Sequence, residues 1–199
     1  MLYKGIVLVI SLVSLLSTNN EEHFQQAHYY VLKSNKIVGH MWCSKLEKNE
    51  TVEYTTESSV NISLLVDISI YNKIQSSFIN GVLHNGTMQR KVNGKQKADT
   101  HIEWNKDKYL ITTTEDSNEL KLKIYFTTGC LMYVEPEHVK EIYSENFRQF
   151  VTIQQIAPHK YALHLPDGKD NYYTYKNGVC VEVEVPTALA TVFIRPANA

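Results

Sequence analysis

The sequence predicts an all-β fold, made mainly of antiparallel strands that form one large, curved up-and-down sheet or an open half-barrel of about ten strands. Two observations lead to this prediction. Apolar and polar residues alternate with period two over many segments, which is typical of strands with one buried and one solvated face. Turn residues, above all Asn-Gly pairs, interrupt the alternation at short intervals and favour tight hairpins between neighbouring strands.

The beginning of the chain differs from the remainder. A single charge at Lys4 precedes an apolar run over 5–16, and the sequence turns polar at Ser17. This is the layout of a secretory signal peptide, and the run is too short to span a membrane as a permanent helix. We therefore expect 1–20 to be a signal peptide and 21–199 to form a single antiparallel β domain. The expected product is exported, periplasmic or extracellular, and soluble rather than integral to the membrane after the leader is removed.

The longest strands are expected between 51 and 79. This stretch is rich in Val, Ile, Thr, Ser and Tyr, and a break near 65–67 divides it into two strands. Asn80-Gly81 and Asn93-Gly94 should form two-residue hairpin turns, because Asn and Gly tolerate positive φ angles. Asn85-Gly86 falls within the strand between those turns, where glycine favours a bulge that bends the sheet.

Three segments of the second half show the clearest alternation. Along 120–126 and 161–165, alternate apolar residues are expected to face the core, with lysines of the first segment facing outward. Along 179–185, the four valines are expected on one face and Cys180, Glu182 and Glu184 on the other. Asn177-Gly178 is a further predicted hairpin turn. The expected inward residues of the first two segments are Leu120, Leu122, Ile124, Phe126, Tyr161, Leu163 and Leu165.

Residues 127–145 break the strand rhythm and concentrate acidic and aromatic side chains. A short helix is expected over 128–133, capped by Thr127 or Thr128 and packed against the sheet. Function is often located where a regular pattern is interrupted. The structural alternative is a loop that crosses the curved sheet and plugs one end of it. The candidate ligand-binding residues chosen here are Tyr133, Glu135, Tyr143 and Glu145.

Composition and motifs argue against several other functions. The formal net charge is -1 and the cationic residues are scattered, so no nucleic-acid partner is expected. The eight histidines show no metal-ligand spacing, and we predict no metal and no other cofactor. No G-x-S-x-G nucleophile motif occurs. Cys130 follows a glycine, where a helix start would lower the thiol pKa, but no base partner can be identified for it. We therefore predict no catalytic residue.

The three cysteines, Cys43, Cys130 and Cys180, leave two possibilities open. In an oxidising compartment one pair would form a disulfide and leave one free thiol. The alternative is that all three are buried and unpaired. Their spacing does not distinguish between the two.

Several short strings, distributed over nearly all of the expected mature chain, resemble an uncharacterised family of exported bacterial β-proteins known mainly from Bacteroidota and described as a domain of unknown function. The resemblance implies an envelope location and a curved antiparallel sheet, similar in outline to the half-barrels of periplasmic lipoprotein carriers. It implies no catalytic residues. The strings that carry it are NGVL at 80–83, VNGK at 92–95, Trp104 in IEWN, LMYVEP at 131–136, IYSE at 142–145, YALHLPDGKDNYYTYKNG at 161–178 and VEVEV at 181–185.

Three classes of function follow, in order of preference. The first is a non-catalytic envelope protein that binds a lipid-like, apolar or amphipathic ligand on the concave face of the sheet. The second is a structural or protein-interaction module of the envelope that docks a partner protein through a patch or an edge strand. The third is a hydrolase that uses 127–145.

Overall fold

The computed structural model describes residues 22–63, 67–187 and 190–197. The expected signal peptide, 1–20, lies outside the described residues. Within the described part, fourteen strands form one sheet in which all neighbouring strands are antiparallel. The strands are β1 Glu22–Lys33, β2 Lys36–Lys48, β3 Thr51–Ser63, β4 Asp67–Ile79, β5 Val82–Val92, β6 Lys95–Asn105, β7 Lys108–Thr113, β8 Ser117–Leu120, β9 Glu141–Ser144, β10 Gln149–Ala157, β11 Lys160–His164, β12 Asp170–Lys176, β13 Val179–Pro186 and β14 Thr191–Pro196.

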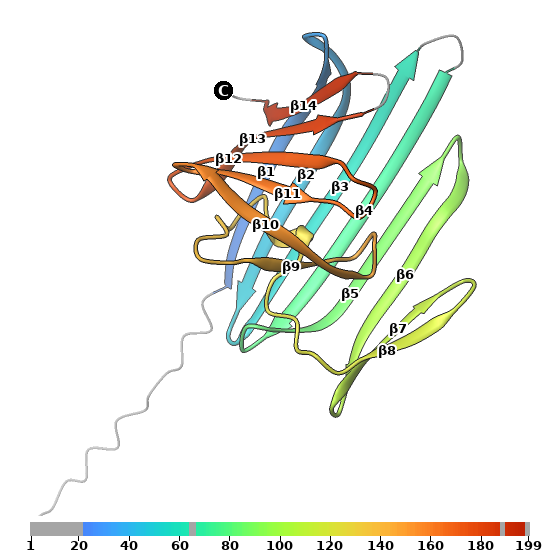
Figure 1. Ribbon diagram of the computed structural model, residues 1–199, viewed down its shortest axis with the longest axis vertical. Helices are drawn as coiled ribbons and strands as arrows, with labels where there is room; N and C mark the ends of the chain where they lie inside the picture. The colour runs from blue at the N-terminus through green and yellow to red at the C-terminus, as the bar shows by residue number, and fades with distance from the viewer. Residues whose placement is uncertain (1–21, 64–66, 188–189, 198–199) are drawn as a thin grey trace, which may run out of the picture.

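The sheet consists of two meanders joined side by side. Its strand order runs from β8 back to β1, passes to β14, and then runs back to β9. In Figure 1 the long strands β1–β6, continued by the shorter β7, form one layer, and β9–β13 lie across it as a second layer. The predicted all-β, antiparallel, curved sheet is therefore confirmed. It contains more strands than the expected ten or so, in part because β8 and β9 are only four residues long and too short to show a period.

The predicted Asn-Gly hairpin turns are confirmed. The φ angles are 51° and 76° at Asn80-Gly81, 50° and 74° at Asn93-Gly94, and 53° and 76° at Asn177-Gly178. Positive φ at both central residues defines a type I′ turn, whose twist matches that of the flanking strands. The predicted break near 65–67 is also present, because β3 ends at Ser63 and β4 begins at Asp67, although 64–66 lie outside the described residues.

The predicted bulge lies next to Asn85-Gly86. Ser77 of β4 pairs with Asn85, but the next residue, Phe78, pairs with Leu83, so His84 is the extra residue of β5. Gly86 itself faces inward, and a Cβ atom at this position would lie 3.4 Å from the Cδ1 atom of Ile102. The bulge shifts which residues of β5 reach the core, as expected when two residues of one strand oppose one of its partner.

The strand predicted over 120–126 is wrong beyond Leu120. There the chain leaves the edge of the sheet and turns inward, so that Leu122 is 64% exposed whereas Ile124 is fully buried. The Ile124 carbonyl accepts a hydrogen bond from the Leu83 N–H, and its own N–H donates to the Tyr109 hydroxyl. The backbone N–H and carbonyl groups of Ile124, which would have paired with a neighbouring strand, thus find their partners on β5 and β7.

The strand predicted over 179–185 is present as β13, but the predicted assignment of its residues to the two faces is wrong. Thr174 of β12 pairs with Glu182 and the next residue, Tyr175, pairs with Cys180, which leaves Val181 as a bulge. Cys180 and Val183 are consequently both buried, and Val179 is 43% exposed. By contrast, Tyr161 and Leu163 are buried as predicted.

The short helix predicted over 128–133 is reduced to one 3-10 turn, η1, at Thr128–Cys130. Thr127 occupies the N-cap position with extended backbone angles but makes no side-chain cap hydrogen bond. Among the described residues, no helix is long and apolar enough to cross a membrane.

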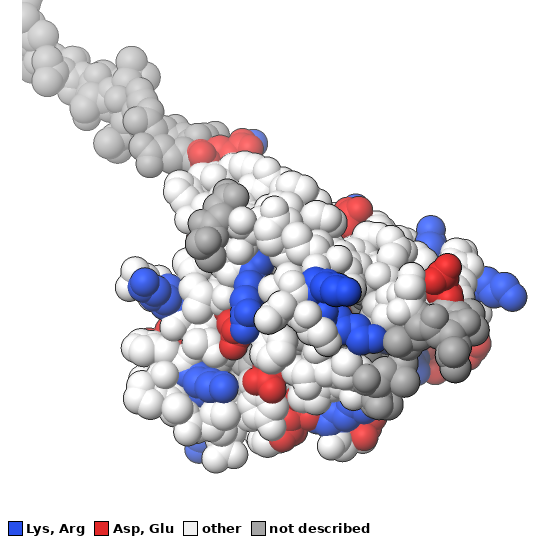
Figure 2. Space-filling model, turned by 90° about the horizontal axis from the view of Figure 1, so that it is seen from above, with Lys and Arg blue, Asp and Glu red and all other residues white. Residues whose placement is uncertain are grey.

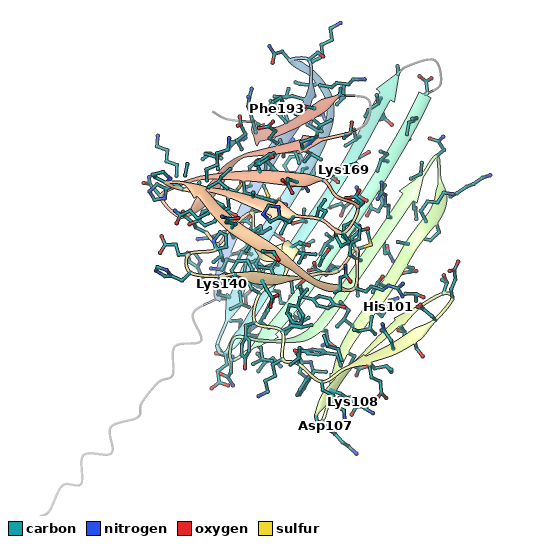
Figure 3. All side chains as sticks on the ribbon, viewed as in Figure 1. His101, Asp107, Lys108, Lys140, Lys169 and Phe193 are labelled. Carbon is teal, nitrogen blue, oxygen red and sulfur yellow. The ribbon has the colours of Figure 1, made fainter. Side chains whose placement is uncertain are left out.

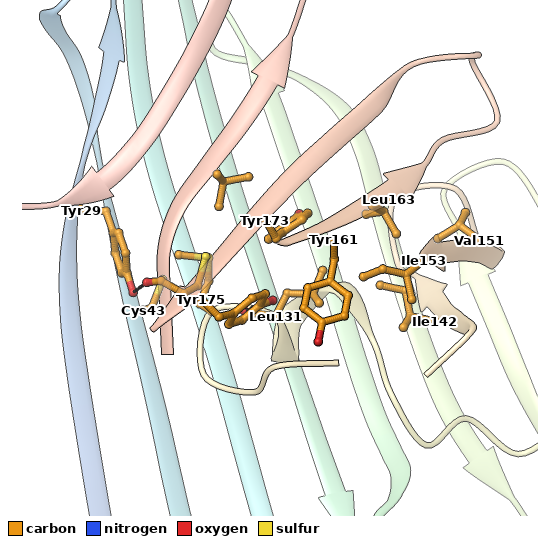
Figure 4. Close-up of a cluster of buried hydrophobic side chains, with 13 residues drawn as sticks. Tyr29, Cys43, Leu131, Ile142, Val151, Ile153, Tyr161, Leu163, Tyr173 and Tyr175 are labelled. Carbon is orange, nitrogen blue, oxygen red and sulfur yellow. Dashed lines mark hydrogen bonds between the residues drawn. The ribbon is translucent and has the colours of Figure 1, made fainter. Parts of the chain in front are cut away.

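The core contains two clusters of buried side chains. The first lies between β1–β2 and β10–β13 and is rich in tyrosine, including Tyr29 and Tyr175 (Figure 4). The second lies against β3–β7 and includes Tyr109 and Tyr143. Residues 121–140, here called the crossing segment, contribute to both clusters. Side chains of both layers and of the crossing segment pack together in these clusters, and Figure 3 shows all side chains on the ribbon. The crossing segment therefore packs on the concave face of the sheet, as the structural alternative for 127–145 required.

Candidate functional site

The four candidate ligand-binding residues do not converge on one cavity. The Tyr133 hydroxyl donates to the Cys43 carbonyl of β2 at 2.7 Å. Glu135 lies elsewhere, and its Oε1 atom is 2.9 Å from the Tyr161 hydroxyl and 3.0 Å from His159 Nδ1. Tyr143 and Glu145 are fully buried on and after β9. The structure therefore distributes these residues over three places.

Glu135 connects the end of the crossing segment to the β10–β11 hairpin. Its side chain is only 6% exposed, although that of His159 is 62% exposed. Burial, together with the hydrogen bond to Glu135, raises the pKa of Tyr161 to about 12. Tyr161 therefore remains a hydrogen-bond donor at neutral pH and holds the carboxylate in place.

Glu145 is the centre of a buried polar cluster beneath η1. Its Oε1 atom accepts hydrogen bonds from the Ser76 hydroxyl of β4 at 2.9 Å and from the Gly129 N–H at 3.3 Å. Its Oε2 atom accepts a hydrogen bond from the Thr128 hydroxyl at 2.5 Å. Thr127 completes the cluster through a hydroxyl contact to Ser76 at 3.3 Å. One carboxylate thus ties η1 to β4, and a buried carboxylate requires such partners.

The three cysteines are free and buried in the described structure. Burial raises the pKa of Cys43, Cys130 and Cys180 to about 12 in each case. The structure thus agrees with a packed, unpaired Cys130 and not with a thiol activated by a helix start. Its thiol is enclosed by the core, where desolvation disfavours the thiolate.

Tyr143 has an unusual hydroxyl. Its ring packs edge-on against Phe150, with centroids 5.6 Å apart. Among the described residues its hydroxyl is buried without a hydrogen-bond partner. Burial, and then the nearby carboxylate of Glu145, raise the pKa of Tyr143. The residue therefore contributes its ring to the second core cluster.

Other buried tyrosines attach the crossing segment to the sheet. The Tyr175 hydroxyl donates to the Leu131 carbonyl at 2.8 Å. The Tyr109 hydroxyl donates to the Leu83 carbonyl at 2.8 Å and accepts from the Ile124 N–H at 3.2 Å. Tyrosine combines a large apolar ring with one polar group that requires a partner when buried. These tyrosines therefore hold the interior together.

Open space remains where the chain leaves β8 and approaches β9. A groove of about 470 Å³ is lined there by the beginning of the crossing segment and by β9 and β10. Leu122 and Tyr125 are both 64% exposed at this place, the largest exposed fractions among the exposed large hydrophobic residues of the described part. We call this the edge groove, and it consists of Lys121, Leu122, Lys123, Tyr125, Glu141 and Phe150.

A second, smaller cavity of about 170 Å³ shares Tyr125 with the edge groove. Its walls come from the concave face of the sheet and from the crossing segment, and most of them are apolar or aromatic. We call this the inner cavity, and it consists of Val52, Tyr54, Phe78, Gly81, Tyr125, Phe126, Cys130 and Val134. Tyr125 thus borders both the edge groove and the inner cavity.

The charges of the edge groove are unbalanced. Lys121 and Lys123 face one carboxylate, Glu141, and among the described residues neither lysine forms an ion pair. Elsewhere, charges of both signs are interspersed, as on the face in Figure 2. The groove was not expected from the sequence, because the alternation over 120–126 predicted a regular strand. Leu122, which was predicted to face the core in that strand, is exposed in the groove instead.

Two comparisons describe what this chain is similar to. A family model described as "Domain of unknown function (DUF6134)" matches residues 29–197. Among solved structures, the chain is similar to a beta-barrel-like protein of domain of unknown function DUF1849 from Brucella abortus, with 11% identity and a TM-score of 0.52. That match covers 86% of this chain and 94% of the other, and it supports the fold alone. No curated protein matches the chain.

Proposed function

This chain belongs to the DUF6134 family, and from that premise we propose that it is a non-catalytic, exported envelope protein that binds an amphipathic ligand with an acidic head group. The proposed site is the edge groove, continued by the inner cavity. The observation that carries the proposal is the exposed pair Leu122 and Tyr125, flanked by two unpaired lysines. Ligand sites are typically apolar spaces with a few placed polar groups.

The position of the proposed ligand follows from the lining. An apolar tail would cover Leu122, Tyr125 and Phe150, which removes apolar surface from water at about 25 cal/mol per Å². An acidic head group would lie near Lys121 and Lys123, where it would offset their charge. The inner cavity offers room for deeper insertion of the tail, so the proposed site lies at this end of the concave face.

The proposal of a non-catalytic role is supported by how the polar groups of 127–145 are used. The acceptor atoms of Glu145 are taken by hydroxyl and N–H donors of the protein itself. The pKa of the buried Cys130 thiol is raised to about 12, which is unfavourable for a nucleophile. A hydrolase centred on 127–145 remains the third and least supported alternative.

Export to the envelope is part of the proposal and has its own test. It is based on the signal-peptide layout of 1–20 and on the resemblance to exported β-proteins of Bacteroidota and, in outline, to lipoprotein-carrier half-barrels. Expression in a bacterium with and without 1–20, followed by fractionation, should place only the longer chain outside the cytoplasm. Equal cytoplasmic retention of both chains would contradict export.

Ligand binding is testable with oleate as the probe, measured by displacement of a fluorescent fatty acid. Leu122→Gln should weaken oleate binding about fivefold, the equivalent of about 1 kcal/mol of apolar contact. The matched control is Leu110→Gln, since Leu110 is a leucine of β7 that is 38% exposed and lies outside both cavities. Equal affinities for the two variants, or no saturable binding by the wild-type chain, would refute the proposed site.

The lysines are tested by comparing oleate with oleyl alcohol, which has the same tail without the charge. Lys121→Gln with Lys123→Gln should reduce the preference for oleate, whereas Lys36→Gln on β2 should not. A preference that is unchanged in the double variant would refute the assignment of the head group. Mass spectrometry of lipids co-purified from native envelopes would then identify the natural ligand.

An interaction module is the alternative, and the free edge of β8 favours it. Among the described residues β8 pairs with β7 and with no other strand. An exposed edge can accept a strand from another protein by β-augmentation. Asn118→Pro would remove a backbone hydrogen-bond donor from β8. The alternative would be supported if the wild-type chain does not bind oleate and if an envelope protein that co-purifies with it is lost in this variant.

A further inference from the structure

Two histidine side chains meet on the face of the β1–β2 hairpin that points away from the core. His28 of β1 lies opposite Trp42 of β2, and His40 of β2 lies opposite Tyr30. The neighbouring residue Tyr29 points inward and is buried. The Nε2 atom of His28 and the Nδ1 atom of His40 are 3.0 Å apart, so two ring nitrogens face each other on the surface.

Aromatic neighbours hold both imidazoles in place. The Trp42 ring stacks on His28 with centroids 3.8 Å apart and an interplanar angle of 8°. The Tyr30 ring packs edge-on against His28 at 5.3 Å and against His40 at 5.6 Å. His40 and Trp42 are exposed, so a small solute can reach the pair from solvent. The two nitrogens are therefore accessible. The two imidazole planes are 13° apart with centroids separated by 5.2 Å, so the nitrogens point at each other and both rings must turn for their lone pairs to converge on one ion.

We propose that His28 and His40 chelate one divalent transition-metal ion, with Cu²⁺ preferred over Ni²⁺ and Zn²⁺. Two nitrogen ligands about 2.0 Å from one ion, at angles of about 90–110°, lie about 2.8–3.3 Å apart. The observed separation of 3.0 Å falls within this range. Imidazole suits these ions, and the order of preference follows the general stability series for divalent metals.

Binding requires a shift of one proton. In the hydrogen-bonded pair one facing nitrogen carries the proton and the other accepts it. For both facing nitrogens to donate lone pairs, the donor ring releases this proton and takes one up at its other nitrogen. The imidazole remains neutral and changes only its tautomer, so the step balances without an external acid or base.

The charged neighbours of the histidine pair compensate one another. Glu57 of β3 lies opposite Trp42 on the same face of the sheet, and its carboxylate is paired with Lys73 at 3.8 Å. Arg195 of β14, opposite Tyr30, is neutralised by Glu182 at 2.7 Å. Among the described residues, no group of three or more His, Cys, Asp and Glu side chains is arranged to hold a metal. The ion would therefore fill its remaining positions with water.

The test uses the tag-free full chain carrying Trp104→Phe, which leaves Trp42 as the only tryptophan of the sequence. Titration with Cu²⁺ should quench Trp42 fluorescence with saturation at one ion per chain. Calorimetry with Ni²⁺ gives a second readout that does not depend on the tryptophan. Both His28→Gln and His40→Gln should weaken binding at least about tenfold, since changes even outside the metal ligands have effects of this size.

His101→Gln is the matched control, because His101 is an exposed histidine on β6 that lies beside the carboxylate of Asp99. It should bind both ions as the parent does. Absence of saturable binding by the parent chain, or the same loss in all three histidine variants, would overturn the proposal. The outcome is independent of oleate binding at the edge groove, because the two sites share no residue.

Discussion

Replacement of Glu145 by alanine should strongly destabilise the protein, because this carboxylate satisfies buried donors from two parts of the chain. Ser76 and Gly129 are both buried and both donate to it. A buried donor left without an acceptor costs about 1–3 kcal/mol, and removal of a buried methylene costs about 0.8 kcal/mol more. For two donors the expected total loss is about 3–7 kcal/mol of the free energy of unfolding.

Glu145→Gln separates the lost hydrogen bonds from the lost volume. Glutamine keeps the size of the side chain and one oxygen for Ser76 and Gly129, and the Thr128 hydroxyl can rotate to accept from the new amide. The expected cost is about 1–2 kcal/mol, because bonds to a charged acceptor are exchanged for neutral ones. Urea denaturation followed by circular dichroism measures both variants.

Equal losses for the alanine and glutamine variants, or a loss below about 1 kcal/mol for alanine, would refute the reasoning. If Glu145→Ala does not fold, Ser76→Ala replaces it. That change removes one hydroxyl donor at 2.9 Å and should cost about 1–2 kcal/mol.

Two further predictions concern the packing and the thiols. Gly39→Ala should lower the free energy of unfolding by about 3 kcal/mol in urea denaturation, because its Cβ would lie 2.4 Å from the Ser59 carbonyl oxygen. Gly86→Ala should cost less, because the nearest contact of its Cβ is a flexible side-chain atom at 3.4 Å. Equal losses for the two variants would contradict this prediction. Burial raises the pKa of Cys43, Cys130 and Cys180 from 9.0 to about 12. As the pH rises, the unfolded chain therefore loses these thiol protons before the folded chain does. The stability that the buried thiols contribute should be full below pH 9 and fall as the pH approaches 12. A urea midpoint that does not change between pH 8 and pH 10.5, or native thiols that react with a thiol reagent at pH 8 as fast as in urea, would disprove the burial of these groups.

The candidate site shows where local patterns stop being informative. The sequence indicated that 127–145 differs from the strands, and Glu135, Tyr143 and Glu145 all have specific roles in the structure. It could not show that these roles are separate, because the partner of Glu145 is Ser76, 69 positions away in the chain. The edge groove was missed for a related reason: alternation over 120–126 is the same whether the segment stays in the sheet or leaves it.

The sequence by itself determined the all-β class and the hairpin turns. Both depend on short-range chemistry, namely a period of two residues and the tolerance of Asn and Gly for positive φ, as at Asn80-Gly81. Tertiary structure decided the path of the crossing segment, the buried contacts of Glu145 and the meeting of His28 with His40. These depend on register and on the way the sheet folds over itself, since a single bulge, as at Val181, changes which face every following residue occupies.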